Sequence, residues 1–394
     1  MIVEVHILQN LAPSNINRDD QGQPKEAMFG GYRRARVSSQ SWKRAVREAF
    51  ENADLVSEDQ RAVRTRQLMF NKDHGLAARF KAAGKDAELS LNVAKALLSG
   101  LGFAPDSKSP EDAPRTQYLL FLGQQEIDGL VQVALDNWDE LAGAVEKAVA
   151  GSKKKDLKAT VPEDVQRATL AVLDGGRAVD LALFGRMLAD LPDKNVDGAT
   201  QVAHAISTHA VDIEWDFFTA VDDLNLKEDT GAGMMGMVDF DSSTLYRYTN
   251  IDMEQLAENL GGDSELAANA LKAYLRAFMC SIPTGKQNSF AAQNLPAFAF
   301  AVVRDAGRWS LANAFVNPVE KGKGDILGKS ILELLKHWTE MTDMYGADGI
   351  TALHAVALGD YAKSLHGTQI TSETSVDGWI SAVVAAQEAS HEQR

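Results

Sequence analysis

Residues 29–50, FGGYRRARVSSQSWKRAVREAF, contain a turn signal followed directly by a helix signal. The paired glycines permit a tight backbone turn. A serine among residues 38–41 can cap a helix that runs through Phe50. The apolar residues of that helix lie on one stripe: Trp42, Ala45, Val46, Ala49 and Phe50. The stretch therefore predicts an amphipathic helix that packs on a core.

A strand pattern precedes this helix, and an exposed loop joins the two. In residues 2–9, Val3, Val5 and Ile7 alternate with polar residues, which is the two-residue period of a strand. Residues 13–24 are rich in Pro, Asn, Asp and Gly and predict an exposed loop.

The rest of the chain divides into a helical part and a strand-rich part. Residues 58–190 carry helical patterns. Aromatic and β-branched residues at 215–223 and 244–252 predict strands, residues 264–281 a helix, and residues 296–303 a buried strand. Without residues 58–190 this order approximates a βαββαβ unit. The sequence therefore predicts an α+β fold with an RRM-like (ferredoxin-like) domain, the architecture of RNA-recognition domains.

Bulk properties restrict the classes of function. The 394 residues carry a formal charge of −15, which by itself argues against nucleic acid, because clustered Lys and Arg hold phosphates. The single cysteine, Cys280, excludes an intrachain disulfide and a multi-cysteine zinc site. The sequence has no run of 18 apolar residues and no basic signal segment. We therefore expect a cytoplasmic protein with no membrane partner.

One segment departs from the acidic average. In residues 25–47, seven basic residues against the single acid Glu26 give a local charge of +6. The basic residues are Lys25, Arg33, Arg34, Arg36, Lys43, Arg44 and Arg47. Hydroxyl, amide and aromatic side chains are interleaved with them, a combination that suits phosphates, sugars and bases. The alternative interpretation is a solvated basic helix face that offsets acidic neighbours.

Residues 204–223 carry two histidines and two adjacent aromatics. His204 and His209 are five residues apart, which does not place them on one helix face, so we interpret both as structural. Phe217 and Phe218 would face opposite sides of a strand. One could pack inward while the other contacts a partner, although packing of both in a core is the simpler interpretation.

Methionines among glycines in residues 231–237, GAGMMGM, suit an adaptable contact surface on a loop. Folding of this loop back on the core is the alternative. The sequence contains no G-x-S-x-G elbow, Walker loop or dinucleotide fingerprint. Asp19 and Asp20 are the only loop acids close to the basic segment, and we interpret them as loop caps. We expect no catalytic residue, no metal site and no cofactor.

Five stretches together resemble one family, the guide-RNA-lining backbone subunit of the type I-E CRISPR Cascade complex, in the RAMP superfamily. They are NRDDQGQPKEAMFGGYRRARVSSQSWKRAVR (17–47), ALFGRM (182–187), VAHAISTHAVD with FFTAVDDL (202–224), LYRYTNI (245–251) and IPTGKQNSFAAQN (282–294). The resemblance implies a discontinuous RRM-like palm at 1–57 and 191–394, a helical finger domain at 58–190 and a β-hairpin thumb at about 210–245.

The resemblance also implies partners and site residues. Copies of the subunit would line the guide RNA, which pairs with target DNA, beside other Cascade subunits and an indirectly recruited helicase-nuclease. The implied guide-RNA contacts are Arg18, Lys25, Arg34, Ser38, Gln40, Lys43, Arg47 and Lys286. The implied thumb wedge and target contacts are Met187, Phe217, Phe218, Met234 and Met235. The sequence departs from the family at Tyr32, where a basic residue is common, and at Phe217, where a Trp-Phe pair begins; here Trp215 lies two residues earlier.

Two other functions compete with this one. Related backbone subunits of other CRISPR types cleave RNA with a metal and a loop aspartate, and Asp19 or Asp20 could take that role. A free-standing RRM-like mRNA binder would instead be a stable monomer. The type I-E resemblance argues against the RNA-cutting enzyme, because in that type a separate helicase-nuclease degrades the target, and it favours a non-catalytic subunit that oligomerises along guide RNA. Light scattering with and without guide RNA would separate the free-standing binder from such a subunit.

Overall fold

The computed structural model describes residues 1–150, 160–220, 223–224, 234–320, 322 and 324–392. Residues 225–233, which hold part of the predicted thumb tip, lie outside the described residues. The chain divides into two compact units. Unit 1 comprises Met1–Leu55, Thr200–Met253 and Ala268–Arg394, and unit 2 comprises Val56–Ala199 and Glu254–Ala267.

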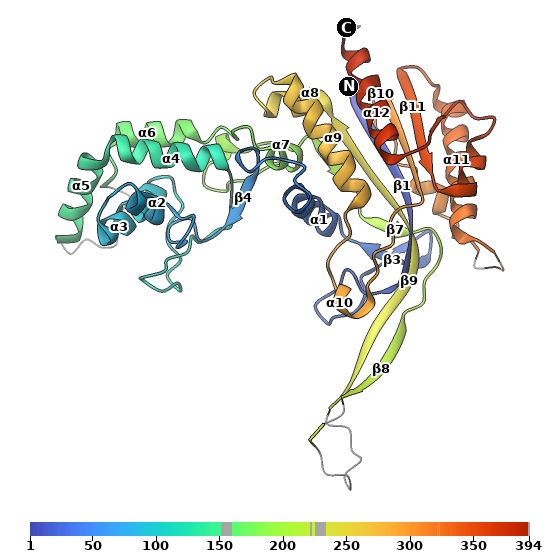
Figure 1. The fold of residues 1–394 in the computed structure, drawn as a ribbon, viewed down its shortest axis with the longest axis horizontal. Coiled ribbons are helices and arrows are strands. Elements are labelled where there is room, and N and C mark those ends of the chain that lie inside the picture. Colours follow the sequence, from blue (N-terminus) through green and yellow to red (C-terminus); the bar gives the residue numbers. More distant parts are fainter. Residues whose placement is uncertain (151–159, 221–222, 225–233, 321, 323, 393–394) are drawn as a thin grey trace. The chain divides into compact units, whose positions relative to one another are not determined.

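Unit 1 is built on one large sheet (Figure 1). Its strands are β1 (Ile2–Ser14), β2 (Glu26–Phe29), β3 (Tyr32–Val37), β6 (Thr200–Val202), β7 (Ala205–Ser207), β8 (Glu214–Ala220), β9 (Met234–Asp252), β10 (Phe298–Arg304), β11 (Ile350–Ala357) and β12 (Thr371–Glu373). The hydrogen-bonded order is β12-β11-β10-β1-β9-β7-β3-β2, and β6 and β8 also pair with β9. Every described pair except β11–β12 is antiparallel.

Helices cover both faces of this sheet (Figure 1). They are α1 (Ser39–Asn52), α9 (Ser264–Cys280), α10 (Gln287–Phe290), α11 (Ile326–Tyr345) and α12 (Val376–Glu392), with 3₁₀ turns η4 (Ala312–Phe315) and η5 (Gly359–Leu365). On one face, Leu8, Phe298 and Phe300 pack in a core with residues of α11. On the other face, Arg247 of β9 packs against aromatic rings of α1 and α9.

The predicted strand at 2–9, the helix that follows the serine run, the helix at 264–281 and the strand at 296–303 are all present. A mixed α/β fold with a central, mostly antiparallel sheet confirms the predicted class at this level. The β2–β3 hairpin was not predicted. It pairs through β3 with β7, Arg36 opposite Ile206, and such a long-range pairing leaves no periodic signal in a short arginine-rich strand.

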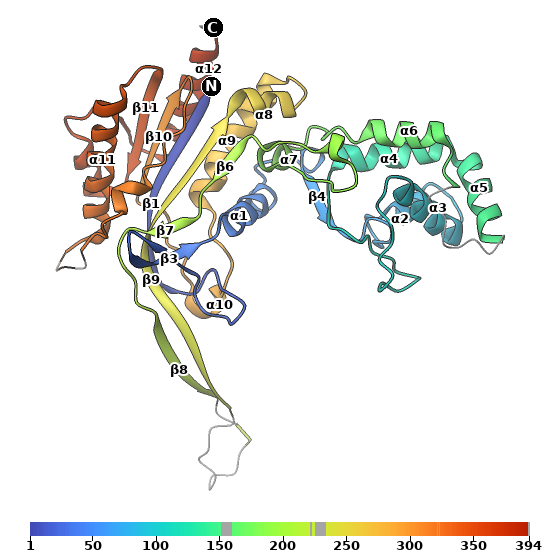
Figure 2. The same ribbon diagram turned by 180° about the vertical axis from the view of Figure 1, so that it is seen from behind.

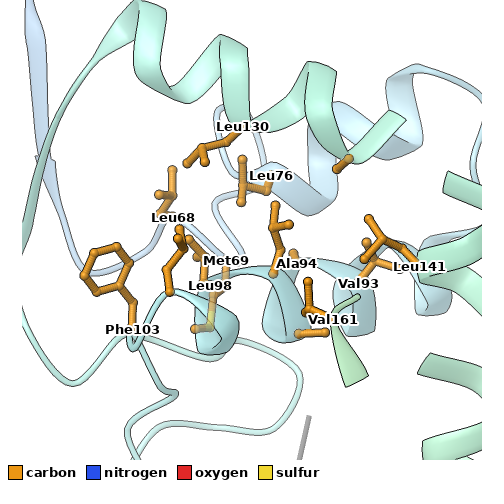
Figure 3. Packing of buried hydrophobic residues seen from close by; sticks show 14 of the residues in the cluster. Leu68, Met69, Leu76, Val93, Ala94, Leu98, Phe103, Leu130, Leu141 and Val161 are labelled. Carbon is orange, nitrogen blue, oxygen red and sulfur yellow. The ribbon is translucent and has the colours of Figure 1, made fainter. Parts of the chain in front are cut away.

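Unit 2 is helical apart from one short sheet. Its elements are η1 (Glu58–Gln60), β4 (Ala62–Thr65), α2 (Leu76–Ala82), α3 (Ala87–Gly100), β5 (Leu120–Gly123), α4 (Gln124–Asp136), α5 (Trp138–Ala150), α6 (Glu163–Val172), α7 (Val179–Phe184), η3 (Pro192–Lys194) and most of α8 (Met253–Asn259). Leu76, Val93 and Leu130 point toward one another in its core (Figure 3). The antiparallel β4–β5 pair lies inside the range predicted to be helical.

Among the described residues no helix is long and apolar enough to cross a membrane.

Candidate nucleic-acid interface

Helix α1 is anchored to the sheet through Trp42. The ring is buried, and the guanidinium of Arg247 lies 3.7 Å from its centre and 4.4 Å from the ring centre of Phe278. Arg247 Nη1 also donates to Gln9 Oε1 at 2.8 Å. Burial lowers the pKa of Arg247 to about 9, so the group remains charged at neutral pH. This buried cation fixes the apolar face of α1 and turns its polar face outward.

The polar face of α1 carries two stripes at helical spacing. Gln40, Lys43 and Arg47 follow one another at intervals of three and four residues, which places them on one side of the helix. Gln40 is exposed, whereas Lys43 and Arg47 are half-buried, and burial lowers the pKa of Lys43. Arg44 lies on the second stripe, where its Nε donates to Glu48 at 2.7 Å.

Further basic residues gather at the N-terminal end of α1. The backbone of Arg36 donates to the carbonyl of Lys25 at 2.9 Å. The backbone N–H of Ser39, the first residue of α1, donates to His204 Nδ1 at 3.0 Å. Partial burial lowers the pKa of His204, and the positive charges of Arg36 and Lys25 lower this pKa further. The predicted contact Ser38 is the buried N-cap residue, and its N–H donates to Asn17 Oδ1 at 2.8 Å. This end of α1 therefore combines positive charge with ordered backbone donors.

Two loops complete the surface beside α1. A pocket of about 530 Å³ is lined by residues of the 16–22 loop, including Arg18, by residues of α1 and by residues 283–285. Gly285 approaches so closely that a Cβ there would lie 2.3 Å from the carbonyl oxygen of Ile16. Lys286 follows in the left-handed conformation, with φ of 52°. The predicted contacts Arg18 and Lys286 thus come from loops that touch each other.

Arg34 does not share this surface. Its side chain is fully buried, Nη1 donates to the carbonyl of Ser207 at 3.0 Å, and Nη2 donates to the carbonyls of Phe315 and Val316 at 2.6 and 3.2 Å. Burial lowers the pKa of Arg34, yet an arginine stays protonated at neutral pH. These contacts do not fit the predicted contact with RNA, so we correct the assignment of Arg34 to a structural role, in which it joins β3 to β7 and to the end of η4.

The acids near the interface have local partners. Glu26 pairs with Arg33 at 3.1 Å. Asp19 Oδ1 accepts from the backbone N–H groups of Gln21 and Gln23, both at 2.9 Å, which is the geometry of a loop cap. Among the described residues no group of three or more His, Cys, Asp or Glu could hold a metal ion.

The β8–β9 hairpin extends from the sheet of unit 1 (Figure 2). It carries the predicted thumb residues Phe217, Phe218, Met234 and Met235 on two faces. Phe217 lies opposite Met237, Phe218 opposite Gly236 and Ala220 opposite Met234. Side chains alternate along each strand, so one face presents a stripe of four large apolar side chains that are each between 54% and 67% exposed: Trp215, Phe217, Met235 and Met237. Such an exposed apolar stripe is typical of a contact surface.

Phe218 and Met234 lie on the opposite face of the hairpin. The ring of Phe218 crosses Gly236 so closely that a Cβ there would lie 2.4 Å from the ring. Nearer the sheet, Phe240 on the same face meets Phe290 of α10, with ring centres 5.8 Å apart. The two adjacent phenylalanines therefore differ: Phe217 belongs to the apolar stripe, and Phe218 packs across the partner strand.

Asp241 lies where the hairpin joins the sheet. Its carboxyl is buried and accepts from Ser243 Oγ at 3.3 Å. Burial raises the pKa of Asp241 to about 6; the hydrogen bond from Ser243 opposes the rise and the nearby charge of Glu26 adds to it.

Met187 is an exposed side chain of unit 2, between two buried neighbours. Arg186 is buried and donates to Glu126 Oε2 at 2.7 Å, and Leu188 packs in the core of unit 2. These anchors fix the segment that presents Met187.

Sequence reasoning missed several features of the interface. It left Trp215 without a role, and it placed Met237 on an adaptable loop, whereas Met237 lies in strand β9. The two-residue alternation of Trp215 and Phe217 is a signal that could have identified the apolar stripe. The bond between His204 and Ser39 joins residues far apart in the chain and has no local signal.

Comparisons with known proteins agree on one family. The model of the CT1975-like protein family matches residues 3–382. A chain of a "CRISPR RNA-guided surveillance complex, pre-nicking" is 36% identical, with a TM-score of 0.86 over 98% of this chain and 100% of that chain. A chain of a "CRISPR RNA-guided surveillance complex" is 30% identical, with a TM-score of 0.76 over the same shares. The comparison with curated proteins found no match. The chain therefore belongs to the CT1975-like family of CRISPR-associated proteins and is a homologue of CRISPR surveillance-complex subunits.

Proposed function

We propose that this chain is the guide-RNA-binding backbone subunit of a type I-E Cascade complex, of the RAMP superfamily. The observation that carries the proposal is the gathering of predicted RNA contacts from separate segments around α1. Lys25, Gln40, Lys43 and Arg47 belong to the N-terminal segment, and Lys286 comes from a loop more than 230 residues later in the chain that touches the loop of Arg18. Positive charge on one ordered surface of an acidic protein suits an RNA backbone.

The sheet supports the finer fold assignment within this proposal. Its central order, β10-β1-β9-β7, with α1 and α9 on one face, agrees with a βαββαβ ferredoxin-like palm. The β8–β9 hairpin corresponds to the thumb, and unit 2 corresponds to the finger domain. In this assignment the subunit repeats along the guide RNA and contacts other Cascade subunits, and target DNA binds by pairing with the guide.

Binding can be tested with the full-length chain and a guide RNA. Light scattering should give a small particle without guide and a much larger one with guide, and filter binding should weaken steeply as salt increases. A monomer of constant mass in both samples would favour the free-standing RNA binder. Absence of RNA binding at low salt would contradict the proposal.

We propose further that the subunit binds RNA without cutting it. Asp19 favours this interpretation, because its carboxylate already caps its own loop. The assembled complex should leave target RNA intact with Mg²⁺ or Mn²⁺ present. Cleavage that disappears in the Asp19→Ala, Asp20→Ala double variant would instead establish the alternative function, a metal-dependent endonuclease.

A further inference from the structure

The imidazole of His204 is a polar group at the interface that the proposed function leaves without a role. His204 lies between β6 and β7, and its side chain is exposed. Its Nδ1 lies 3.0 Å from the backbone nitrogen of Ser39. A backbone N–H can only donate, so Nδ1 is the acceptor of this bond. In the neutral ring the single proton therefore resides on Nε2, which becomes a hydrogen-bond donor.

The surroundings keep the ring neutral. Partial burial lowers the pKa of His204, and the positive charges of Arg36 and Lys25 lower it further. At neutral pH, Nδ1 thus remains an acceptor for Ser39 and Nε2 remains a donor. Among the described residues Nε2 has no hydrogen-bond partner. A donor on a ring that is already fixed by the protein loses little conformational entropy when it binds a ligand.

We propose that His204 Nε2 donates a hydrogen bond to an acceptor oxygen of the guide's sugar–phosphate backbone beside the N-terminal end of α1. The inference rests on the proposed RNA-binding function and adds a contact to it. Ser38 and Gln40, both predicted RNA contacts, flank the Ser39 that fixes the ring. Lys25 and Arg36, whose charges act on the ring, would hold the same stretch of backbone electrostatically. The acceptor is a phosphate oxygen or a ribose 2′-hydroxyl.

Two substitutions by amide side chains distinguish the role of Nδ1 as an acceptor from the role of Nε2 as a donor. In His204→Asn, the side-chain oxygen can replace Nδ1 as the acceptor for Ser39, but no donor reaches the place of Nε2. In His204→Gln, the longer side chain brings an amide donor close to that place. A purely structural His204 predicts that His204→Asn is the better tolerated change, whereas a contact to RNA predicts the opposite order.

The experiment is filter binding of the full-length chain to guide RNA, with melting temperatures measured alongside. We expect His204→Gln to bind within about twofold of the parent, and His204→Asn to bind about 3- to 10-fold more weakly, the loss of one hydrogen bond. Both should melt close to the parent. His366→Asn, the same change at an exposed residue of the C-terminal part of unit 1, should bind as the parent does.

A guide with 2′-deoxy sugars distinguishes the acceptors. If the loss in His204→Asn persists with this guide, the acceptor is a phosphate oxygen, and if it vanishes, the acceptor is a 2′-hydroxyl. Parent-like binding by His204→Asn, or equal losses in the Asn and Gln variants with lowered melting temperatures, would overturn the inference alone. Failure of the parent to bind guide RNA would instead overturn the proposed function, and this inference with it.

Discussion

The basic segment around α1 and the β8–β9 hairpin differ in which kind of side chain is buried and which kind is exposed. In the first region Arg34 is buried and donates to three carbonyls. Beside α1, Arg247 from the sheet-paired part of β9 is also buried, against the rings of Trp42 and Phe278. In the second region the apolar side chains of Phe217, Met235 and Met237 are more exposed than buried. Charged guanidinium groups are therefore buried in the first region, whereas apolar side chains are exposed in the second.

The difference arises from the neighbours that each region has. Strand β7 and the segment at the end of η4 offer Arg34 carbonyl acceptors, and a buried charge is tolerated when its hydrogen bonds are made. The hairpin is a two-stranded ribbon, and all seven residues of β8 are exposed. An isolated hairpin has too little core for much stability of its own, so its apolar stripe is available to a partner.

The largest expected effect is that of removing the Arg34 side chain. Arg34→Ala should lower the free energy of unfolding by about 3 kcal/mol, because two buried carbonyl groups and one partly buried carbonyl group lose a charged donor. Urea denaturation of the full-length chain measures this. The control is Arg33→Ala, the adjacent residue, whose exposed side chain pairs with Glu26. It should leave the denaturation midpoint nearly unchanged. Equal effects of the two substitutions would contradict the contrast between buried and exposed arginines.

The fold was predictable where the signal is local. Alternation in β1 and the apolar stripe of α1, including Trp42, predict these elements correctly, since both periods are set by backbone geometry. The β2–β3 hairpin depends on pairing with β7. Residues 254–267 belong to unit 2, where Asn259 donates hydrogen bonds to the carbonyls of Ala182 and Asp197. Such long-range contacts are absent from any single stretch of sequence.

The site was predictable in residue type more than in placement. The run YRRAR indicates a basic surface, yet it cannot say that Arg34 turns inward while Arg33 turns outward. Alternation places the two on opposite faces of a strand, but which face is covered depends on the segment near Phe315. The stripe of Gln40, Lys43 and Arg47 followed from helical spacing once α1 was located.

Asp241 tests the junction between the two regions. Its folded pKa, about 6, exceeds the ordinary value of 3.8, so the folded protein binds this proton more tightly than the unfolded chain does. The stability that the proton contributes is fully present below pH 4 and is lost as the pH rises through about 6. Asp241→Asn removes the titration and should raise the free energy of unfolding at pH 7 by about 1–3 kcal/mol.

Urea denaturation of the parent and of Asp241→Asn between pH 3.5 and 7.5 measures this difference. The two curves should converge at the acidic end and separate between pH 4 and 6. Parallel curves across the whole range would show that the carboxyl of Asp241 does not govern stability at the base of the hairpin.

Charge reversal on α1 tests the basic surface. Lys43→Glu with Arg47→Glu should weaken guide-RNA binding about tenfold or more, because two attractions to phosphate are replaced by two repulsions. The salt dependence should also flatten, by about 0.7 in the logarithmic slope for each phosphate that is no longer neutralised. The matched control is Lys336→Glu with Lys363→Glu, two exposed lysines of unit 1 outside the α1 surface, with the same change in net charge. Equal weakening by both pairs would mean that net charge alone, and not this stripe, attracts the RNA.

The smallest expected effect on stability belongs to the hairpin end. Met234 and Met235 lie opposite Ala220 and Thr219, and their side chains are largely exposed. If they were core residues, truncation would cost about 2–5 kcal/mol each. Because they are exposed, Met234→Ser with Met235→Ser should leave the melting temperature of the free subunit within about 2 °C of the parent. If they form the wedge that the family resemblance implies, their apolar surface would offset the cost of unstacking bases, and target-DNA binding by the assembled complex should then weaken several-fold. The resemblance also implies that each thumb displaces one nucleotide at regular intervals, so chemical probing of the parent complex should show periodically unpaired target positions, which the double variant should lose. Met344→Ser, at an exposed residue of α11, should change neither property. A drop of many degrees with an intact probing pattern would show that the hairpin end is packed as core, and the contrast between the two regions would then fail.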